Sequence, residues 1–330
     1  MKGTIQLFKI QGIPICVHWS FSFVLVWVFF TAYSYETGLN SMLLKINALS
    51  ILTLFSIVIL HELGHALVAR RLHIATTKIV LLPLGGVAML ENQSFSPKKD
   101  LLISLAGPMT NFALVLLFLP LLWVFPESVI HQMVEVVLHP QHPLIMVSHL
   151  NSFQWFVFLF ILVNLSIAVF NLIPALPLDG GRILKAILAM RMEELSAVTY
   201  TVWIGNILAL AVMTYGFWTD HFLFIVLGAY VIATSSGIIK RAKILEILKK
   251  TTVGEILIPV DDFLRANGQN PNEETWNFSD APYDISTSTP LNVAVDLMLK
   301  EDVQFIPVAE DGEVKGILSL SVINTFIGRF

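Results

Sequence analysis

The sequence predicts a polytopic α-helical membrane protein with about six transmembrane helices, a membrane-associated hairpin and a small cytoplasmic α+β domain at the end of the chain. Of the 330 residues, 55% are hydrophobic and only 13% are charged, about half the roughly 25% of a typical soluble domain. Six stretches are long and apolar enough to cross a bilayer core of ~30 Å. After Lys250 the composition changes to that of a soluble domain.

The same composition excludes several classes of protein. The low share of charged residues argues against an ordinary soluble enzyme and against a disordered chain. A net charge of −4 does not favour binding to nucleic acid. The single cysteine, Cys16, excludes an intramolecular disulfide framework and a cysteine-based zinc cluster. The chemistry of this chain must therefore come from the few polar residues that lie at membrane depth.

The predicted spans share one orientation signal. The six spans cover residues 17–33, 46–69, 101–125, 153–173, 195–218 and 222–239. Lys and Arg cluster before the first span and after the second, fourth and sixth, whereas the opposite connections contain only Lys45. By the positive-inside rule this pattern predicts an integral, multi-pass protein with both termini in the cytoplasm.

Two segments of the membrane part do not fit a spanning helix. Residues 74–90 contain Pro83 and Gly85-Gly86, and predict a hairpin that dips into the membrane with its backbone groups bonded to other protein. Residues 126–151 predict a loop on the outer side. This loop contains four histidines that could bind a metal ion: His131, His139, His142 and His149. Their spacing fits no compact metal site, so a solvated loop is favoured.

The end of the chain reads as a separate small module. Residues 241–250 are a basic linker, and residues 251–330 follow as an α+β domain near the lower size limit for an independent core. Its expected elements are a polar loop, an amphipathic helix, two strands joined by an Asp311-Gly312 turn, and a closing helix. In order, they cover residues 261–282, 290–299, 303–308, 314–319 and 321–327.

The second span carries an HExxH motif, His61-Glu62-Leu63-Gly64-His65. Residues four apart share one face of a helix, so both imidazoles can bind the same metal ion. Glu62 stands where it can take a proton from water rather than bind the ion. Three ionisable side chains without a function are costly at membrane depth. The motif therefore predicts a zinc site with His61 and His65 as ligands and Glu62 as the general base.

A catalytic zinc ion needs a third protein ligand, and Asp179 is the preferred candidate. It follows the fourth span in an apolar stretch where prolines end a helix and two glycines let the backbone turn. The alternative role for Asp179 is to cap the helix that begins near Arg182. His18, at the cytoplasmic start of the first span, stays possible as a ligand. The other acidic residues on this side stand beside basic, solvated sequence: Glu91, Asp100, Glu193 and Glu194.

Four motifs together resemble the site-2 proteases, which are intramembrane zinc metalloproteases of peptidase family M50. The motifs are His61 to His65, Pro-Leu-Gly-Gly-Val at 83–87, Ala-Gly-Pro-Met-Thr-Asn at 106–111, and the Asn-x-x-Pro-x-x-Pro-Leu-Asp-Gly-Gly string at 171–181. The resemblance implies a transmembrane metalloprotease domain at 1–240. It also implies one zinc ion per chain, held by His61, His65 and Asp179, with Glu62 as general base. Asn171 would help to hold the substrate backbone, and Asn111 would be structural.

The tail resembles a single CBS repeat, on the Ile-Pro-Val piece at 306–308 and the Val-Lys-Gly-Ile-Leu-Ser piece at 314–319. CBS repeats work in pairs, and Thr252 to Leu257 is the expected lead-in of this one. A homodimer through the tail would supply the second repeat. The family's usual ribose-binding Asp falls where Val322 stands, which argues against nucleotide binding.

The resemblance implies a zinc metalloendopeptidase of a bacterial inner or plasma membrane. It would hydrolyse peptide bonds within or near the transmembrane helix of a membrane-tethered substrate, in regulated intramembrane proteolysis. The alternative is a metal-ion transporter or channel with a regulatory CBS-like tail. Transporters usually contain repeats of broken helices, none of which relates the two halves here, and a transit site has no need of Glu62. A structural zinc site is disfavoured because three ligands leave the coordination open.

Overall fold

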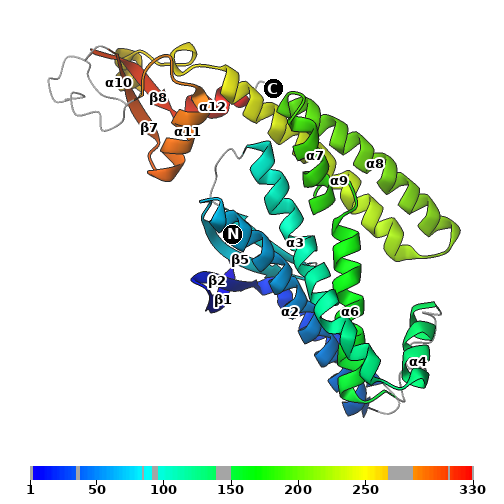
Figure 1. Cartoon of the computed structure of the whole chain (residues 1–330). Coiled ribbons are helices and arrows are strands. Elements are labelled where there is room, and N and C mark those ends of the chain that lie inside the picture. The colour runs from blue at the N-terminus through cyan, green and yellow to red at the C-terminus, as the bar shows by residue number, and fades with distance from the viewer. Residues whose placement is uncertain are drawn as a thin grey trace. The chain divides into compact units, whose positions relative to one another are not determined.

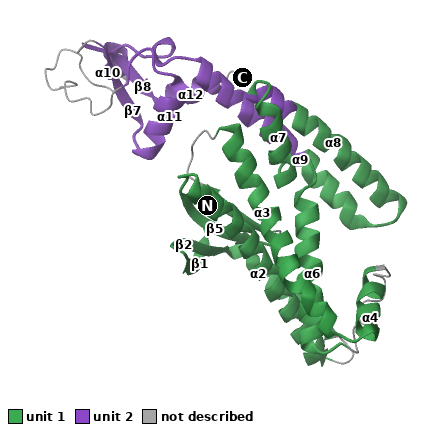
Figure 2. Cartoon of the chain, viewed as in Figure 1, with its two compact units in different colours: residues 1–193, 200–232 green, residues 194–199, 233–330 purple. Residues whose placement is uncertain are grey.

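The computed structural model describes residues 3–34, 38–83, 85–90, 96–138, 150–266, 285–310 and 313–328 (Figure 1). These residues form two compact units (Figure 2). The first unit comprises residues 1–193 and 200–232, and the second comprises residues 194–199 and 233–330. Helices α8 (Glu194–Trp218) and α9 (Phe222–Lys250) contribute to both units.

Among the described residues, five helices are long and apolar enough to cross a membrane, with mean hydropathies of 1.7 to 2.2. They correspond to five of the six predicted spans. They are α2 (Ser41–Arg71), α3 (Pro97–Phe118) with the short helix η2 (Leu119–Val124), α6 (Ser152–Asn171), α8 and α9. Their ends follow local chemistry. The Asn40 side chain accepts from two amides at the start of α2, and Asn151 forms a capping box with Gln154 at the start of α6.

The first predicted span is shorter than expected. Residues Trp19–Ala32 form the helices η1 (Trp19–Phe21) and α1 (Ser22–Ala32), which at 1.5 Å per residue reach ~21 Å, less than the ~30 Å bilayer core. The helix cannot begin earlier because Ile13–His18 form strand β2. Two further strands follow α1 as a small pair, β3 (Tyr33–Ser34) and β4 (Gly38–Leu39).

The predicted hairpin at 74–90 is present as strands β5 (Thr76–Leu82) and β6 (Gly85–Leu90). It belongs to a larger sheet of order β1-β2-β5-β6, in which β1 (Thr4–Ile10) and β6 are the edges. The sequence analysis missed the β1–β2 hairpin, although residues 4–18 carry β-branched residues on both sides of a Gln11-Gly12 turn. The sheet packs on α2 through a core that includes Ile15, Ile79, Leu81, Phe55 and Ala66.

The predicted outer loop at 126–151 contains a helix, α4 (Glu127–Leu138), so the prediction of a loop is wrong for these residues. The helix forms because apolar residues recur at helical spacing, and its Met133 and Val136 pack against Phe158 of α6. His131 lies on the exposed side of α4, 3.9 Å from Glu135. The other three histidines of the predicted loop lie outside the described residues: His139, His142 and His149.

The second unit follows the order predicted for the tail. After α9 and the short helix η3 (Val253–Glu255), its elements are α10 (Val260–Ala266), α11 (Leu291–Lys300), β7 (Phe305–Glu310), β8 (Glu313–Ser319) and α12 (Leu320–Ile327). Strands β7 and β8 are antiparallel, and the core includes Leu291, Met298, Ile306 and Ile323. Helix α10 occupies the start of the predicted loop at 261–282, and residues 241–250 are the last turns of α9. The predicted Asp311-Gly312 turn lies outside the described residues.

Candidate metal centre

The first two residues of the candidate centre stand on one face of α2. His61 and His65 are separated by one helical turn, and each is only 4% exposed. Their Nε2 atoms lie 3.2 Å apart. The HExxH spacing therefore places both imidazole rings on one face of α2, close enough to bind the same metal ion, as predicted.

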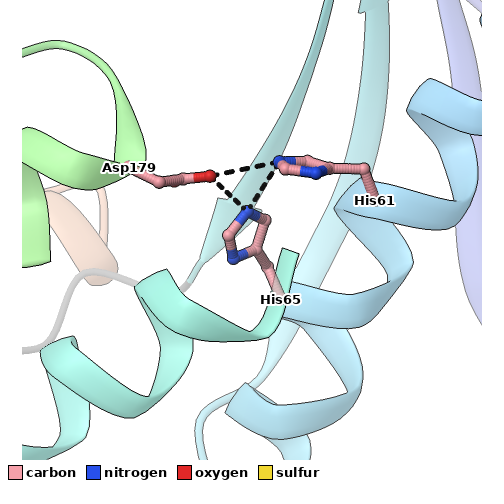
Figure 3. A group of neighbouring side chains, drawn as sticks. All are labelled: His61, His65 and Asp179. Carbon is pink, nitrogen blue, oxygen red and sulfur yellow. Dashed lines mark hydrogen bonds and ion pairs between the residues drawn. The ribbon is translucent and has the colours of Figure 1, made fainter. Parts of the chain in front are cut away.

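The third residue is Asp179, which comes from the first turn of α7 (Asp179–Ala189). Its Oδ2 atom lies 3.1 Å from Nε2 of His61 and 3.1 Å from Nε2 of His65. Figure 3 shows the three side chains pointing toward one another from α2 and α7. The carboxylate is buried, and it does not cap α7, whose N-cap residue is Leu178. The group His61, His65 and Asp179 can therefore hold a metal ion.

Asp179 reaches the two histidines because the chain folds back sharply after α6. A Cβ atom at Gly180 would stand 2.3 Å from the carbonyl oxygen of Leu172, and one at Gly181 would stand 2.4 Å from the amide nitrogen of Leu176. Both contacts are too short for any side chain. The two glycines thus allow the first turn of α7 to pack directly on the backbone that precedes it.

The remaining candidate ligands lie in other environments. Nδ1 of His18 is 2.8 Å from the hydroxyl of Ser20, and His18 is the N-cap residue of η1. Glu194 forms an ion pair with Lys249 at 2.7 Å, Glu193 is the N-cap residue of α8, and Glu91 lies outside the described residues. Among the described His, Cys, Asp and Glu residues, only His61, His65 and Asp179 form such a group.

The contacts of the two rings suit a metal ion. Nδ1 of His65 lies 2.6 Å from the carbonyl oxygen of Ile103, and Nδ1 of His61 lies 2.7 Å from Oδ1 of Asn111. Because both oxygens only accept, each Nδ1 donates, and in a neutral ring each Nε2 then carries a lone pair that faces the carboxylate of Asp179. A metal ion at this point would accept lone pairs from the two rings and from the carboxylate. In a tetrahedral zinc site, ligand atoms at ~2.0–2.1 Å from the metal are about 3.3–3.4 Å apart, close to the distances found here.

Gly107 of α3 keeps the space beside the rings open. A Cβ atom at this position would stand 2.2 Å from Nε2 of His65 and 2.7 Å from Cε1 of His61. The residues present therefore fit a metal ion both in their chemistry and in the room left to their ligand atoms.

Glu62 is separate from the three candidate ligands and faces the sheet. Its Oε2 atom accepts from the backbone N–H of Ala88 in β6 at 2.9 Å. A Cβ atom at Gly86 of the same strand would stand 2.7 Å from Cγ of Glu62. The carboxylate thus lies between the HExxH helix and an edge strand, which leaves it free to act on a proton instead of binding the ion.

The prediction that Asp100 lies in a solvated stretch is wrong. Asp100 is 6% exposed and forms ion pairs with Arg182 at 2.9 Å and with Lys185 at 2.6 Å. It stands in the first turn of α3, whereas both cations stand on α7, the helix that begins with Asp179. The cations that neutralise Asp100 are therefore not its sequence neighbours Lys98 and Lys99 but Arg182 and Lys185, which hold α7 against α3.

The other predicted site residue, Asn171, is the last residue of α6, and its Nδ2 donates to the carbonyl of Ile167 at 3.1 Å. It is not among the three converging side chains. Asn111, interpreted as structural, contacts His61 directly. The signal that could have identified its partner Asn164 is an amide inside an otherwise apolar span, since a polar group there is costly without a function.

The chain is similar in sequence to known metalloproteases. The model of peptidase family M50 matches residues 49–214, which include all three candidate ligands. A zinc metalloprotease of Methanocaldococcus jannaschii is 30% identical over 98% of this chain and 80% of its own length. Stage IV sporulation protein FB of Bacillus subtilis is 34% identical over 41% of this chain and 38% of its own length. The solved structure of a site-2 protease from M. jannaschii is 30% identical, with a TM-score of 0.49 over 71% of this chain and 94% of that chain.

We expect Gly107→Ala to reduce zinc affinity more than tenfold, because the added methyl group displaces the ring of His65. The helix itself should form at least as well, since Ala favours a helix by roughly 1 kcal/mol over Gly. Zinc affinity of the purified full chain, measured by competition with a chelator, checks this. Gly237→Ala in α9 is the matched control, because nothing lies within 4 Å of a Cβ there. Equal zinc affinity in Gly107→Ala and wild type would contradict the expectation.

We expect Asp100→Asn to loosen the attachment of α7 to α3 and so weaken metal binding by Asp179. Loss of one partner of a buried ion pair costs ~3–5 kcal/mol. We expect about 1–3 kcal/mol here, because the Arg182 and Lys185 side chains are 30% and 24% exposed. Thermal unfolding in detergent, with and without added zinc, measures both effects. An Asp100→Asn variant with the stability and zinc-dependent shift of wild type would show that the ion pairs do not support the site.

Proposed function

Because the chain belongs to peptidase family M50, we propose that it is an intramembrane zinc metalloendopeptidase that hydrolyses peptide bonds within or near the transmembrane segments of membrane-tethered substrates. The observation that carries the proposal is the convergence of the buried side chains of His61, His65 and Asp179. Two of them stand with the carboxylate of Glu62 on α2, a helix apolar enough to span a membrane. Ionisable side chains at such a position are expensive to bury and are usually functional.

The proposed role of each residue follows from its position in the site. His61, His65 and Asp179 would hold one zinc ion. When bound, zinc polarises the scissile carbonyl and acidifies water. Glu62, one residue along the helix from His61, would accept the proton of the attacking water and pass it to the leaving amine. Its carboxylate is half-buried and, among the described residues, accepts a hydrogen bond from the amide of Ala88, a partner that it can exchange for water.

We infer that the substrate segment unwinds and adds to the edge of the sheet. A peptide bond inside a helix is hydrogen-bonded and shielded, so hydrolysis needs an extended backbone. Strand β6 is an edge of the sheet, and it carries the Ala88 amide that contacts Glu62. An extended peptide paired with β6 would therefore lie beside the general base. Asn171 would help to hold that backbone, a role that its place eight residues before Asp179 in the motif supports.

The proposed topology has six spans with both termini in the cytoplasm of a bacterial cell, and α1 as the shortest span. The distribution of Lys and Arg supports it. His61 lies nine residues before Arg70, so at 1.5 Å per residue the centre would be about 13 Å inside the cytoplasmic interface. Water would reach it beside the β5–β6 hairpin, whose two strands pair with each other.

The tail would act as a CBS-like module, and a homodimer through it would complete the usual pair of repeats. Helix α11, the β7–β8 hairpin and α12 share one core, which supports a folded module of this size. Val322 stands where the ribose-binding Asp would be, so a role in assembly is proposed in preference to nucleotide binding. The alternative of a metal transporter with this tail is not favoured, because the matching relatives are metalloproteases.

We expect Glu62→Gln to reduce cleavage by a factor of about 10²–10⁴ while zinc stays bound, because the variant loses the proton acceptor and none of the ligands. Quantitative comparison of membrane proteomes, from cells that produce wild type and cells that produce Glu62→Gln, identifies the proteins whose cleavage depends on this carboxylate. Cleaved fragments should disappear in the variant, and their intact precursors should accumulate.

The control is the zinc content of the two purified proteins, which should be equal. Undiminished cleavage by a zinc-loaded Glu62→Gln protein would overturn the mechanism. Metal flux into vesicles that survives the same substitution would instead support the transporter.

A further inference from the structure

A chain of side-chain hydrogen bonds runs from α6 through α3 to His61. It begins at Asn164, which is completely buried inside α6. Its Nδ2 donates to the carbonyl oxygen of Phe160 at 2.8 Å. Because a carbonyl only accepts, the NH₂ end of the amide must face Phe160, and Oδ1 must face away from it, toward α3.

The next member is Asn111 of α3, which is also completely buried. Its Nδ2 donates to Oδ1 of Asn164 at 3.2 Å, which turns its own Oδ1 toward Nδ1 of His61, 2.7 Å away. The reverse orientation of Asn111 would bring two amide oxygens face to face at the Asn164 contact. The direction of every bond thus follows from the carbonyl of Phe160, and Nδ1 of His61 is the atom that carries the proton.

We propose that Asn164 and Asn111 are positioning residues that hold His61 in the tautomer that can bind a metal ion. This inference rests on the metal site of the proposed function and extends it to α6, a fourth helix beside α2, α3 and α7. With the proton on Nδ1, the lone pair of Nε2 faces Asp179 and His65. A histidine ligand usually donates its other nitrogen to such a partner, and loss of the partner typically costs 10–100-fold in metal affinity.

The two histidines differ in how they are held. His65 donates directly to the backbone carbonyl of Ile103, which cannot turn around. His61 donates to a side-chain amide, which can turn by 180° and present its NH₂ group instead. Only His61 therefore depends on a second side chain to fix its partner. Two amides buried in an apolar bundle would be costly without such a role, because apolar residues of similar size could fill the same space.

The test is zinc affinity of the full chain in detergent, by competition with a chelator, together with the visible absorption of bound Co²⁺. We expect Asn164→Leu to lower zinc affinity by about 10–100-fold and to weaken the absorption of a four-coordinate site. The matched control is Ser166→Ala, which removes a polar group from an exposed position of the same helix and should leave affinity unchanged. Where Asn164→Leu does not fold, the smaller change Asn164→Ala replaces it.

A second substitution separates positioning from general support of the fold. Asn111→Asp, added to Asn164→Leu, gives His61 a partner whose two oxygens both accept, whatever stands at 164. Zinc affinity should then return to within about threefold of wild type. Unchanged affinity in Asn164→Leu, or the absence of rescue in the double variant, would overturn the positioning role. A wild-type chain that binds no zinc would instead overturn the proposed function itself.

Discussion

The structure depends on the contact between two imidazole rings of α2 and one carboxylate of α7, brought together in an apolar bundle. The three side chains are costly to bury singly, and their lone pairs repel when they converge. A cation at the point of convergence reverses that balance, since the ligand atoms of His61, His65 and Asp179 are spaced at nearly the distances of a tetrahedral zinc site. The surrounding helices are arranged so that this contact can form.

Helix α3 and strand β6 support the centre from different sides. Helix α3 provides Asn111 and the Ile103 carbonyl for the rings, and Gly107 leaves them room. Its first turn also carries Asp100, which holds α7 through two ion pairs. Strand β6 receives Glu62 on the other side of α2. Helix α3 thus contacts the two imidazole rings, and strand β6 contacts the carboxylate of Glu62, so the candidate ligands and the candidate base have separate supports.

Much of the fold could be predicted because long apolar stretches have few alternatives in a membrane. The helices of the five long spans, the hairpin at 74–90 and the small α+β tail were all predicted from hydropathy, turn residues and periodicity. The elements that were predicted wrongly or missed share a physical cause. The β1–β2 hairpin, the start of α1 and helix α4 are short elements that become stable by packing on β5 and on α6, and short elements carry little signal of their own.

The sequence by itself determined what depends on neighbours along the chain. Residues four apart share a helix face, so the HExxH motif was enough to bring His61 and His65 to one point. Only the tertiary structure decided which residues complete the site. Asp179 is 118 residues from His61, and the choice between ligand and helix cap depended on how α7 folds back. The buried pairing of Asp100 and the amide chain through Asn111 and Asn164 were decided in the same way, because partners from separate helices meet only in the folded chain.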